Sequence, residues 1–406
     1  MRISTSTMYE TGVAQLNTLQ SNLARTQQQL AANRRILSPS DDPIAAARAL
    51  EVTQSKAVNT QFATNRDNAR ASLAQVDLRL GGVTSLIQNA QSLVVAAGNP
   101  VLSAADRQSL AIEVEGQLED MLGLANSTDG AGSYLFAGYK SATEPFGKTA
   151  GGALYSGDQG QRELQVSSSR KVAISDPGSA IFESNMTGNG KFSTSVSAAN
   201  TGSGVVSGSS VTNAAALTGN QYEVTFAGSG SGATFTVLDM KTGVAPAGMS
   251  GPQPFVPGQK IEFDGVSFSV RGSPAAGDKI AVDPSSRQSV FKTLTDLLAT
   301  LRAPDSGSAG TTAYTNGLVK AGENLSSALD NVLSARSSVG TRLNELDALD
   351  SAGDDLNVQY EATLSKLQDL DLLAAISQYS QQQTTLEAAQ KSFKSLTGLS
   401  LFNYIG

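Results

Sequence analysis

The sequence predicts an α+β fold, with long terminal α-helices that form a coiled-coil or helical-bundle body and a mainly antiparallel β domain inserted in the middle. Apolar residues have helical spacing from about 10 to 140 and again from about 286 to the end. Residues from about 145 to 285 are instead rich in Gly, Ser, Thr and Val and contain short alternating runs. Aromatic residues make up only 5% of the chain, which fits thin helical packing better than a thick globular core.

The first predicted helix carries leucines seven residues apart, the spacing of a helix that packs along another helix. They are Leu16, Leu23, Leu30 and Leu37, with Leu19 in the intermediate position. A break follows at Ser38-Pro39-Ser40-Asp41-Asp42-Pro43. There we expect Asp42 to be an N-cap and Pro43 to be the first residue of the next helix.

That next helix should run to about Ala97, a length on the order of 80 Å at the usual rise of an α-helix. Gly98-Asn99-Pro100 should end it, and a further helix is expected from about Ala104 to Leu124.

The helical pattern returns from about Tyr314 and ends in a second set of apolar residues at heptad spacing. This set is Leu372, Tyr379, Leu386 and Phe393, with Ile376 between them. Both ends of the chain therefore carry a narrow apolar seam. We expect the two ends to meet as a coiled coil, either within one chain or between copies.

The pattern of the middle of the chain, from about 145 to 285, predicts β-strands. Asp264-Gly265 lies between two alternating runs, which is a strong hairpin signal. A second hairpin is expected where 154–155 and 164–166 flank Gly157-Asp158-Gln159-Gly160. The Gly/Ser-rich stretch 201–219 is expected to be a flexible loop.

Composition argues against an enzyme. The chain has no His and no Cys, so it lacks the commonest general base, a thiol nucleophile and the usual zinc ligands. We therefore expect no catalytic residue, no cofactor and no metal ion. A net charge of -7 also disfavours binding to nucleic acid or to an anionic membrane surface.

Two glycine motifs are weak candidates for phosphate binding. Residues 142–149 fit a loose phosphate-loop pattern, but Pro145 removes a backbone donor and Glu144 would repel phosphate. Gly228, Gly230 and Gly232 lie among serines between two predicted strands, where a loop is the simpler interpretation.

Paired carboxylates occur at four places and could in principle perform acid–base chemistry. They are Asp41-Asp42, Glu119-Asp120, Asp354-Asp355 and Asp369/Asp371. We interpret the first pair as helix capping and the others as solvated faces. No apolar run approaches the roughly 18 to 20 residues that span a bilayer, and residues 1–7 lack the apolar core of a secretory signal peptide.

Several stretches resemble the flagellin superfamily, and more narrowly its hook-associated protein 3 family. They are Met1–Ser6, Leu16–Gln20, Ile36–Pro43, Leu124–Ser127, Tyr134–Lys140, Tyr155–Gly160, Ser338–Asn344, Leu364–Asp371 and Leu399–Tyr404. They cover both helical ends and the segment before the β insertion, whereas 175–285 has little family signature.

The resemblance implies three domains. Residues 1–42 and 365–406 would be terminal helices of a coiled-coil core (D0-like). Residues 43–174 and 286–364 would be a helical bundle with a β-hairpin (D1-like), and 175–285 an inserted β domain (D2-like).

The resemblance also implies a function. The chain would be a secreted structural protein of the bacterial flagellum, exported unfolded after a cytoplasmic chaperone has held its C-terminal helix. Copies would form one ring layer at the hook–filament junction, between hook-associated protein 1 and the first flagellins. The seam residues would be buried in that assembly, and the termini of an isolated monomer would be poorly ordered.

Three alternatives of other kinds remain open: a filament flagellin, an adhesin or binding module acting through the β insertion, and an enzyme in that insertion. The sequence also departs from many relatives at 31–35, where Ala-Ala-Asn-Arg-Arg replaces Ser-Thr-Gly-Lys-Arg. Loss of that glycine should make the first helix more continuous.

Overall fold

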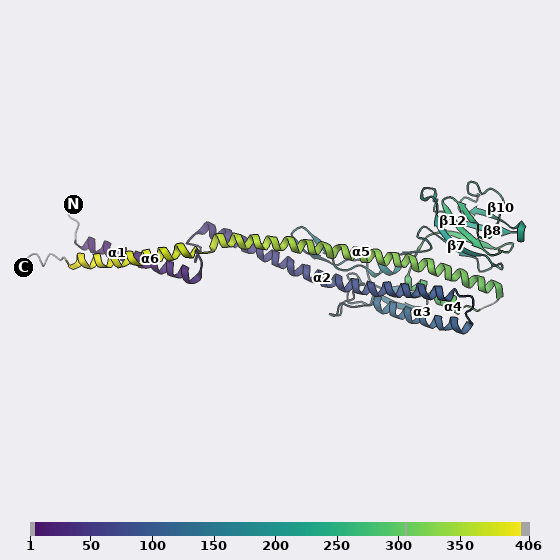
Figure 1. Ribbon diagram of the computed structural model, residues 1–406, viewed down its shortest axis with the longest axis horizontal. Helices are drawn as coiled ribbons and strands as arrows, with labels where there is room; N and C mark the ends of the chain where they lie inside the picture. The colour runs from purple at the N-terminus through teal and green to yellow at the C-terminus, as the bar shows by residue number, and fades with distance from the viewer. Residues whose placement is uncertain (1–4, 305–306, 399–406) are drawn as a thin grey trace, which may run out of the picture. The chain divides into compact units, whose positions relative to one another are not determined.

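The computed structural model describes residues 5–304 and 307–398, and its helices dominate both ends of the chain (Figure 1). The helices are α1 (Thr5–Ala32), α2 (Pro43–Ala97), α3 (Ala104–Ala125), α4 (Val290–Arg302), α5 (Gly307–Gln368) and α6 (Leu372–Gly398). The chain divides into two compact units, Met1–Thr64 with Ala348–Gly406, and Asn65–Asp347.

The strands lie between α3 and α4, and each of their described pairings is antiparallel. The strands are β1 (Phe146–Thr149), β2 (Gly152–Tyr155), β3 (Glu163–Gln165), β4 (Lys171–Ala173), β5 (Asn185–Met186), β6 (Phe192–Val196), β7 (Val205–Val211), β8 (Tyr222–Ala227), β9 (Thr234–Asp239), β10 (Gln253–Pro254), β11 (Lys260–Phe263), β12 (Val266–Arg271), β13 (Lys279–Pro284) and β14 (Arg287–Gln288). The predicted α+β fold class is confirmed.

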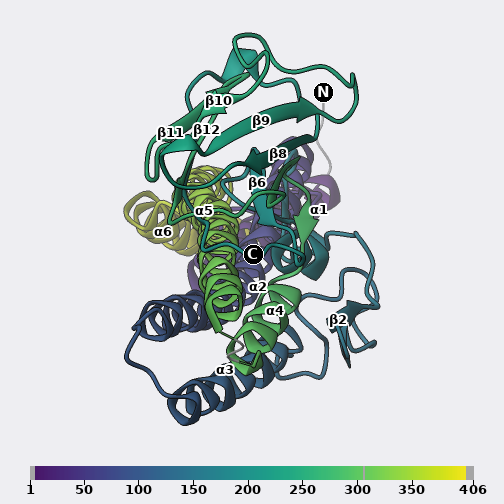
Figure 2. The same ribbon diagram turned by 90° about the vertical axis from the view of Figure 1, so that its right-hand side faces the viewer.

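The strands β6 to β13 form a β domain of two sheets with one shared core. The five-stranded sheet has the order β10-β9-β8-β13-β6, and the three-stranded sheet has the order β11-β12-β7. Their inner faces supply one apolar cluster, in which the rings of Tyr222 and Phe263 from opposite sheets lie 5.0 Å apart. Figure 2 shows these strands together on one side of α5.

The hairpin predicted at Asp264-Gly265 is confirmed. It joins β11 to β12, and both turn residues have positive φ, 43° and 78°. Two positive φ angles in succession give a turn whose twist matches that of the flanking strands, which is why Asp-Gly is favoured there.

The hairpin predicted across 154–166 is wrong. β2 pairs with β1, the strand that precedes it in the sequence, and β3 pairs with β4, the strand that follows it. The reason lies in Asp158, whose carboxylate accepts the backbone N–H groups of Tyr139 (2.9 Å), Lys140 (3.1 Å) and Gly160 (2.8 Å). These bonds fix the turn to the preceding segment, and they hold the pKa of Asp158 below its usual value.

The flexible loop predicted over 201–219 is also wrong in part, because it contains β7. This strand pairs with β12, with Val206 opposite Val270. A sequence such as Val-Val-Ser-Gly-Ser-Ser-Val has alternating small residues that fit an edge strand as well as a loop.

The helical part of the second unit has a heptad core that the sequence analysis did not single out. On α2 the fully buried residues repeat at alternating steps of three and four: Ala69, Leu73, Val76, Leu80, Val83, Ile87 and Ala90. α4 packs against α3 and buries its own apolar face beside it. Both α5 and α3 contact this stretch, since Arg336 forms an ion pair with Asp77 at 3.0 Å and a Cβ on Gly82 would lie 3.1 Å from Leu124. Its heptad residues are thereby shielded from water.

Four phenylalanines outside the β-domain core form a separate buried aromatic cluster. The ring centroid of Phe146 lies 5.3 Å from that of Phe182 and 5.1 Å from that of Phe291. The ring of Phe136 packs edge-on to that of Phe182, with 5.4 Å between the centroids. All four side chains are fully buried. The cluster fixes the segment after α3 and the start of α4 to one another.

Candidate assembly interface of the terminal helices

The two terminal helices α1 and α6 lie side by side within the first unit (Figure 1). The predicted seam residues that are half-buried here are Leu16, Leu19, Leu23 and Leu30 on α1, and Tyr379, Leu386 and Phe393 on α6. We call these seven residues the paired seam. The rings of Tyr9 and Phe393 lie 5.3 Å apart, and Gly12 gives Phe393 room, since a Cβ on this residue would lie 2.7 Å from the ring.

One polar bond sets the register of the pair. Thr26 is buried between the leucines, and its hydroxyl donates to the side-chain oxygen of Gln382 at 2.9 Å. The same hydroxyl also reaches the carbonyl of Asn22 at 3.1 Å. A buried polar pair of this kind disfavours other registers, in which the groups would lose their partners.

Three of the predicted seam residues lie outside the paired seam. Leu372 is 48% exposed, Ile376 56% and Leu37 38%. Their neighbour Leu373, which the heptad argument missed, is 85% exposed. We call Leu372, Leu373 and Ile376 the open patch. The helix pair therefore uses only part of the predicted seam and leaves the start of α6 uncovered.

Leu37 lies outside α1 because the helix ends at Ala32. The expectation of a more continuous first helix is wrong, since Asn33 adopts the left-handed conformation, with φ 51°. Asn tolerates this conformation better than most residues other than Gly, so it ends the helix as a glycine would.

The break after α1 and the break between α5 and α6 are joined to each other. The backbone N–H of Arg35 donates to the carbonyl of Gln368 at 2.8 Å, and Arg34 forms an antiparallel bridge with Asp369. The guanidinium of Arg35 also donates to the carbonyl of Leu367 at 2.8 Å. The two interruptions, distant in sequence, thus form one joint.

Two aspartates organise the chain before α2. Asp42 Oδ1 accepts the N–H of Ala45 at 3.0 Å, and Pro43 is the first residue of the helix. Asp41 Oδ2 accepts the N–H groups of Leu37 (2.9 Å) and Ser38 (3.0 Å). These backbone bonds are the largest cause that lowers the pKa of each carboxyl.

An aspartate also caps the start of α6, where Asp371 Oδ1 accepts the N–H of Ala374 at 3.1 Å. Caps at α2 and α6 satisfy amide groups that a helix start leaves without partners. Each cap therefore helps to fix where its helix begins at the joint.

The remaining sequence candidates that the structure describes lie in a strand, in an ion pair or on the exposed surface. Within the loose phosphate-loop pattern, 146–149 is the strand β1, and β2 rather than a helix follows it. Lys148 forms an ion pair with Glu119. Asp120, Asp354 and Asp355 are exposed. In residues 5–304 and 307–398, no three acidic side chains are placed to share a metal ion.

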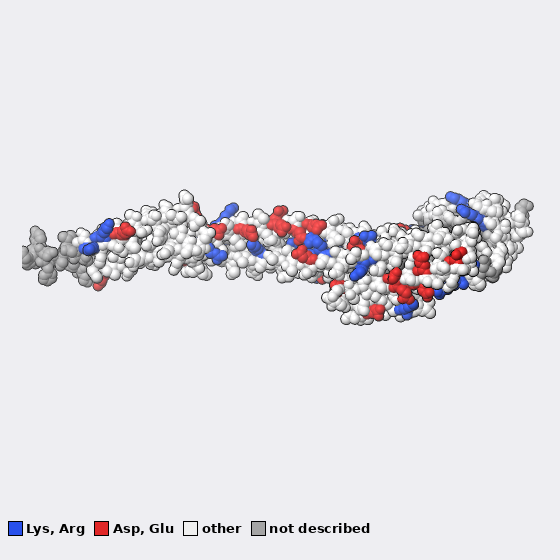
Figure 3. Space-filling model, turned by 60° about the horizontal axis from the view of Figure 1, so that its bottom comes forward, with Lys and Arg blue, Asp and Glu red and all other residues white. Residues whose placement is uncertain are grey.

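Charge is sparse on the terminal helices. α1 has Glu10 and Arg25 in 28 residues, and α6 has Glu387, Lys391 and Lys394 in 27. On the face drawn in Figure 3, a stretch of this helix pair bears no charged side chain. Such a surface desolvates at little electrostatic cost, which suits it to contact with other helices.

Long helices at both ends with an inserted β domain define a flagellin-like class of protein, and a family model of the bacterial flagellin N-terminal helical region matches residues 3–141. Flagellar hook-associated protein 3 of Escherichia coli (strain K12) is 31% identical over 404 residues, 99% of each chain. The protein of that name from Salmonella typhimurium is 30% identical over 402 residues, again 99% of each chain. The chain belongs to the flagellar hook-associated protein 3 family, which confirms the resemblance.

Solved structures agree with this assignment. The flagellar hook-associated protein-3 of Legionella pneumophila superimposes with a TM-score of 0.73 at 31% identity, covering 78% of this chain and 98% of that one. FlgL of Xanthomonas campestris gives a TM-score of 0.70 at 30% identity, covering 77% of this chain and 99% of that one. Across the described residues, no helix combines the length and apolarity that crossing a membrane requires.

Proposed function

We propose that this chain is a structural subunit of the bacterial flagellum that forms the junction ring between hook-associated protein 1 and the flagellin filament. The observation that carries the proposal is the match along 99% of both chains to hook-associated protein 3 of E. coli. The paired seam and the open patch support it, because a helix pair with uncovered apolar residues suits self-assembly. In this proposal the protein acts by packing and performs no catalysis.

The proposed organisation has three parts. Residues 1–42 and 365–406 form the coiled-coil core domain, and the paired seam holds its two helices together. Residues 43–174 and 286–364 form the bundle, and 175–285 the inserted β domain. Asp41, Asp42 and Pro43 fix the boundary between the first two parts, and the open patch faces neighbouring copies.

The proposed partners are further copies of this chain in one ring layer, hook-associated protein 1 on one side and flagellin on the other. Before export, a cytoplasmic flagellar chaperone would hold the C-terminal helix, and the unfolded chain would leave through the flagellar secretion channel. Support comes from family membership and from the sparse charge of the terminal helices.

Labelling of intact flagella tests the proposed position. Antibodies against the β domain should mark a short band at the boundary of hook and filament. Labelling along the whole filament would instead identify a filament flagellin and would refute the junction role.

A further inference from the structure

Three asparagines lie on one side of α5 and reach segments far away in the sequence. Asn316, Asn324 and Asn331 are spaced by eight and seven residues, which places them within about 80° of one another around the helix. Asn316 and Asn324 are buried. Buried amides of this kind are retained in proteins only where they are hydrogen-bonded.

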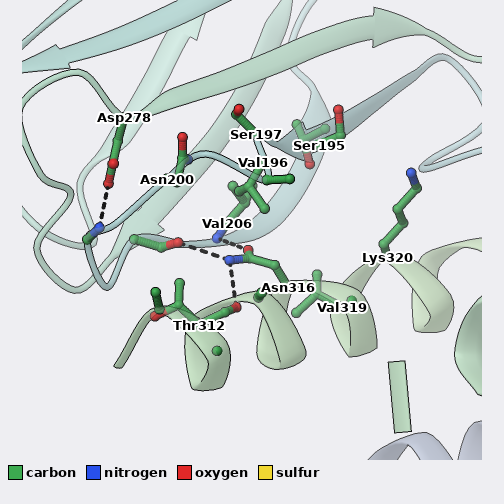
Figure 4. A pocket seen from close by; sticks show the side chains of 18 of the residues that line it. Ser195, Val196, Ser197, Asn200, Val206, Asp278, Thr312, Asn316, Val319 and Lys320 are labelled. Carbon is green, nitrogen blue, oxygen red and sulfur yellow. Dashed lines mark hydrogen bonds between the residues drawn. The ribbon is translucent and has the colours of Figure 1, made fainter. Parts of the chain in front are cut away.

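Asn316 binds the edge of the β domain. Its Oδ1 accepts the backbone N–H of Val206 at 2.9 Å, and its Nδ2 donates to the carbonyl of Gly204 at 3.0 Å, as Figure 4 shows. β7 is one of the two edge strands of the three-stranded sheet. The side-chain amide therefore takes the place that a neighbouring strand would occupy.

Asn324 binds the chain where it enters the β domain. Its Oδ1 accepts the backbone N–H of Gly188 at 2.8 Å. Gly188 has φ 61°, and a Cβ at this position would lie 2.3 Å from the carbonyl oxygen of Phe192. Asn331 continues the row but binds the carbonyls of Ala180 (3.0 Å) and Ile181 (2.9 Å), which precede the domain. We call Asn316 and Asn324 the asparagine mount.

Among the described residues, the apolar core of the β domain does not extend onto α5. The core cluster of the β domain consists of residues between Phe192 and Val282 and includes none from α5. Beside Asn316, a cavity of about 420 Å³ separates β6 and β7 from the helix, which presents Ala309, Gly310 and Ala313 to it. Lys320, which Figure 4 labels, and Glu323 also line this cavity.

We propose that the β domain is fixed to α5 mainly by the asparagine mount and lifts off the helix as an intact body when the mount opens. The domain keeps its own core in that movement, since its apolar residues pack on one another. Hydrogen bonds are directional but contribute little net stability each, so the mount sets one orientation without locking it. The β domain would thereby change its angle on α5 without unfolding.

Hydrogen exchange in the full-length chain tests the mount. In Asn316→Ala the amide of Val206 should exchange about tenfold faster, and in Asn324→Ala the amide of Gly188 should do the same. Amides in the core strands β8 and β13 should keep their protection. The matched control is Asn344→Ala, an exposed asparagine on the same helix.

Two exchange results would overturn the proposal. One is unchanged exchange at Val206 and Gly188 in their respective variants. The other is equal loss of protection in β8 and β13, because the domain would then unfold rather than lift.

A distance measurement checks the movement itself. The chain has no cysteine, so spin labels can be placed at Thr236→Cys on β9 and Ser334→Cys on α5, both exposed sites. One distance distribution is expected in the parent chain and in Asn344→Ala. The combined variant Asn316→Ala/Asn324→Ala should show a second distribution at longer distances. A single distance distribution in that variant would refute the lifting motion.

Discussion

At the scale of the residue, single side chains at the joint decide where helices begin and end. Asn33 ends α1 through its left-handed backbone, and Asp42 and Asp371 each accept an amide at the start of the next helix. The carboxylate of Asp41 binds two amides of the connecting segment. A few polar contacts thus position helices that are otherwise held by apolar surfaces.

Substitution of Asn33 should test its conformation. Asn33→Ala removes the short polar side chain that lets Asn tolerate the left-handed region and should destabilise the joint by about 1 kcal/mol, whereas Asn33→Gly should be nearly neutral. The amide of Arg35, which bonds to Gln368, reports the joint by hydrogen exchange. Equal exchange rates in the two variants would contradict this account.

Acid should loosen the joint. The pKa values of Asp41 and Asp42 lie below their ordinary values in the folded chain, because both carboxylates accept backbone N–H groups. A lowered pKa stabilises the fold above the unfolded-state pKa, and that stability is lost as the pH falls through the folded-state pKa. NMR titration of the two carboxyl groups should give midpoints below about 3.9. Midpoints at or above that value would show that the bonds do not persist in solution.

At the scale of the element, the same heptad pattern has two outcomes. On α2 the heptad residues are completely buried, and both α3 and α5 contact this stretch. On α1 and α6 the seven residues of the paired seam are only half-buried where the two helices contact each other. The open patch at the start of α6 belongs to neither arrangement. Its three apolar side chains are available to a neighbouring copy.

Two aspartate substitutions on α6 should separate pairing from assembly. Leu386→Asp places a charge in the paired seam and should destabilise the α1–α6 pair by about 2 kcal/mol or more, while the β domain stays folded. Helix content by circular dichroism should fall, and filament attachment and swimming should be lost. Normal swimming in this variant would contradict the role of the seam.

Leu373→Asp is the companion variant. Since Leu373 is exposed, the helix content of the isolated chain should be unchanged, yet ring assembly should fail because the patch would carry a charge. Sedimentation of the isolated chain and electron microscopy of flagella measure the two effects. Intact junctions in Leu373→Asp would show that the open patch does not face another copy.

At the scale of the whole molecule, the two compact units differ in how well they are packed. The second unit contains the heptad core of α2, the aromatic cluster around Phe146 and the β-domain core. In the first unit, the seam residues of the α1–α6 pair are only half-buried. A thin helix pair buries less apolar area per ordered residue than a bundle, so it has less free energy to offset its ordering entropy.

Limited proteolysis of a dilute monomer should therefore cut the ends first. Cleavage is expected within α1 and α6, leaving a resistant fragment that includes residues 65–347. Mass spectrometry of the fragments and circular dichroism before and after cleavage provide the measurement. Helical ends as resistant as the bundle would show that the terminal pair is stable without other copies.

The sequence alone determined the type and the order of the main elements. Heptad spacing, the Asp-Pro start of α2 and the Gly-Asn-Pro stop after Ala97 are local signals, and they depend on backbone conformation and side-chain period. Asp264-Gly265 likewise specifies its turn through positive φ angles. Such features can be predicted because each acts within a few residues.

Only the tertiary structure decided which surfaces are covered. Asp158 formed a turn with Tyr139 instead of a hairpin, a Gly/Ser-rich stretch became the edge strand β7, and Asn316 bound that edge from α5. The seam of the terminal helices also divided into a paired part and an open patch. In each case burial depends on neighbours distant in sequence, which the period of a single segment cannot specify.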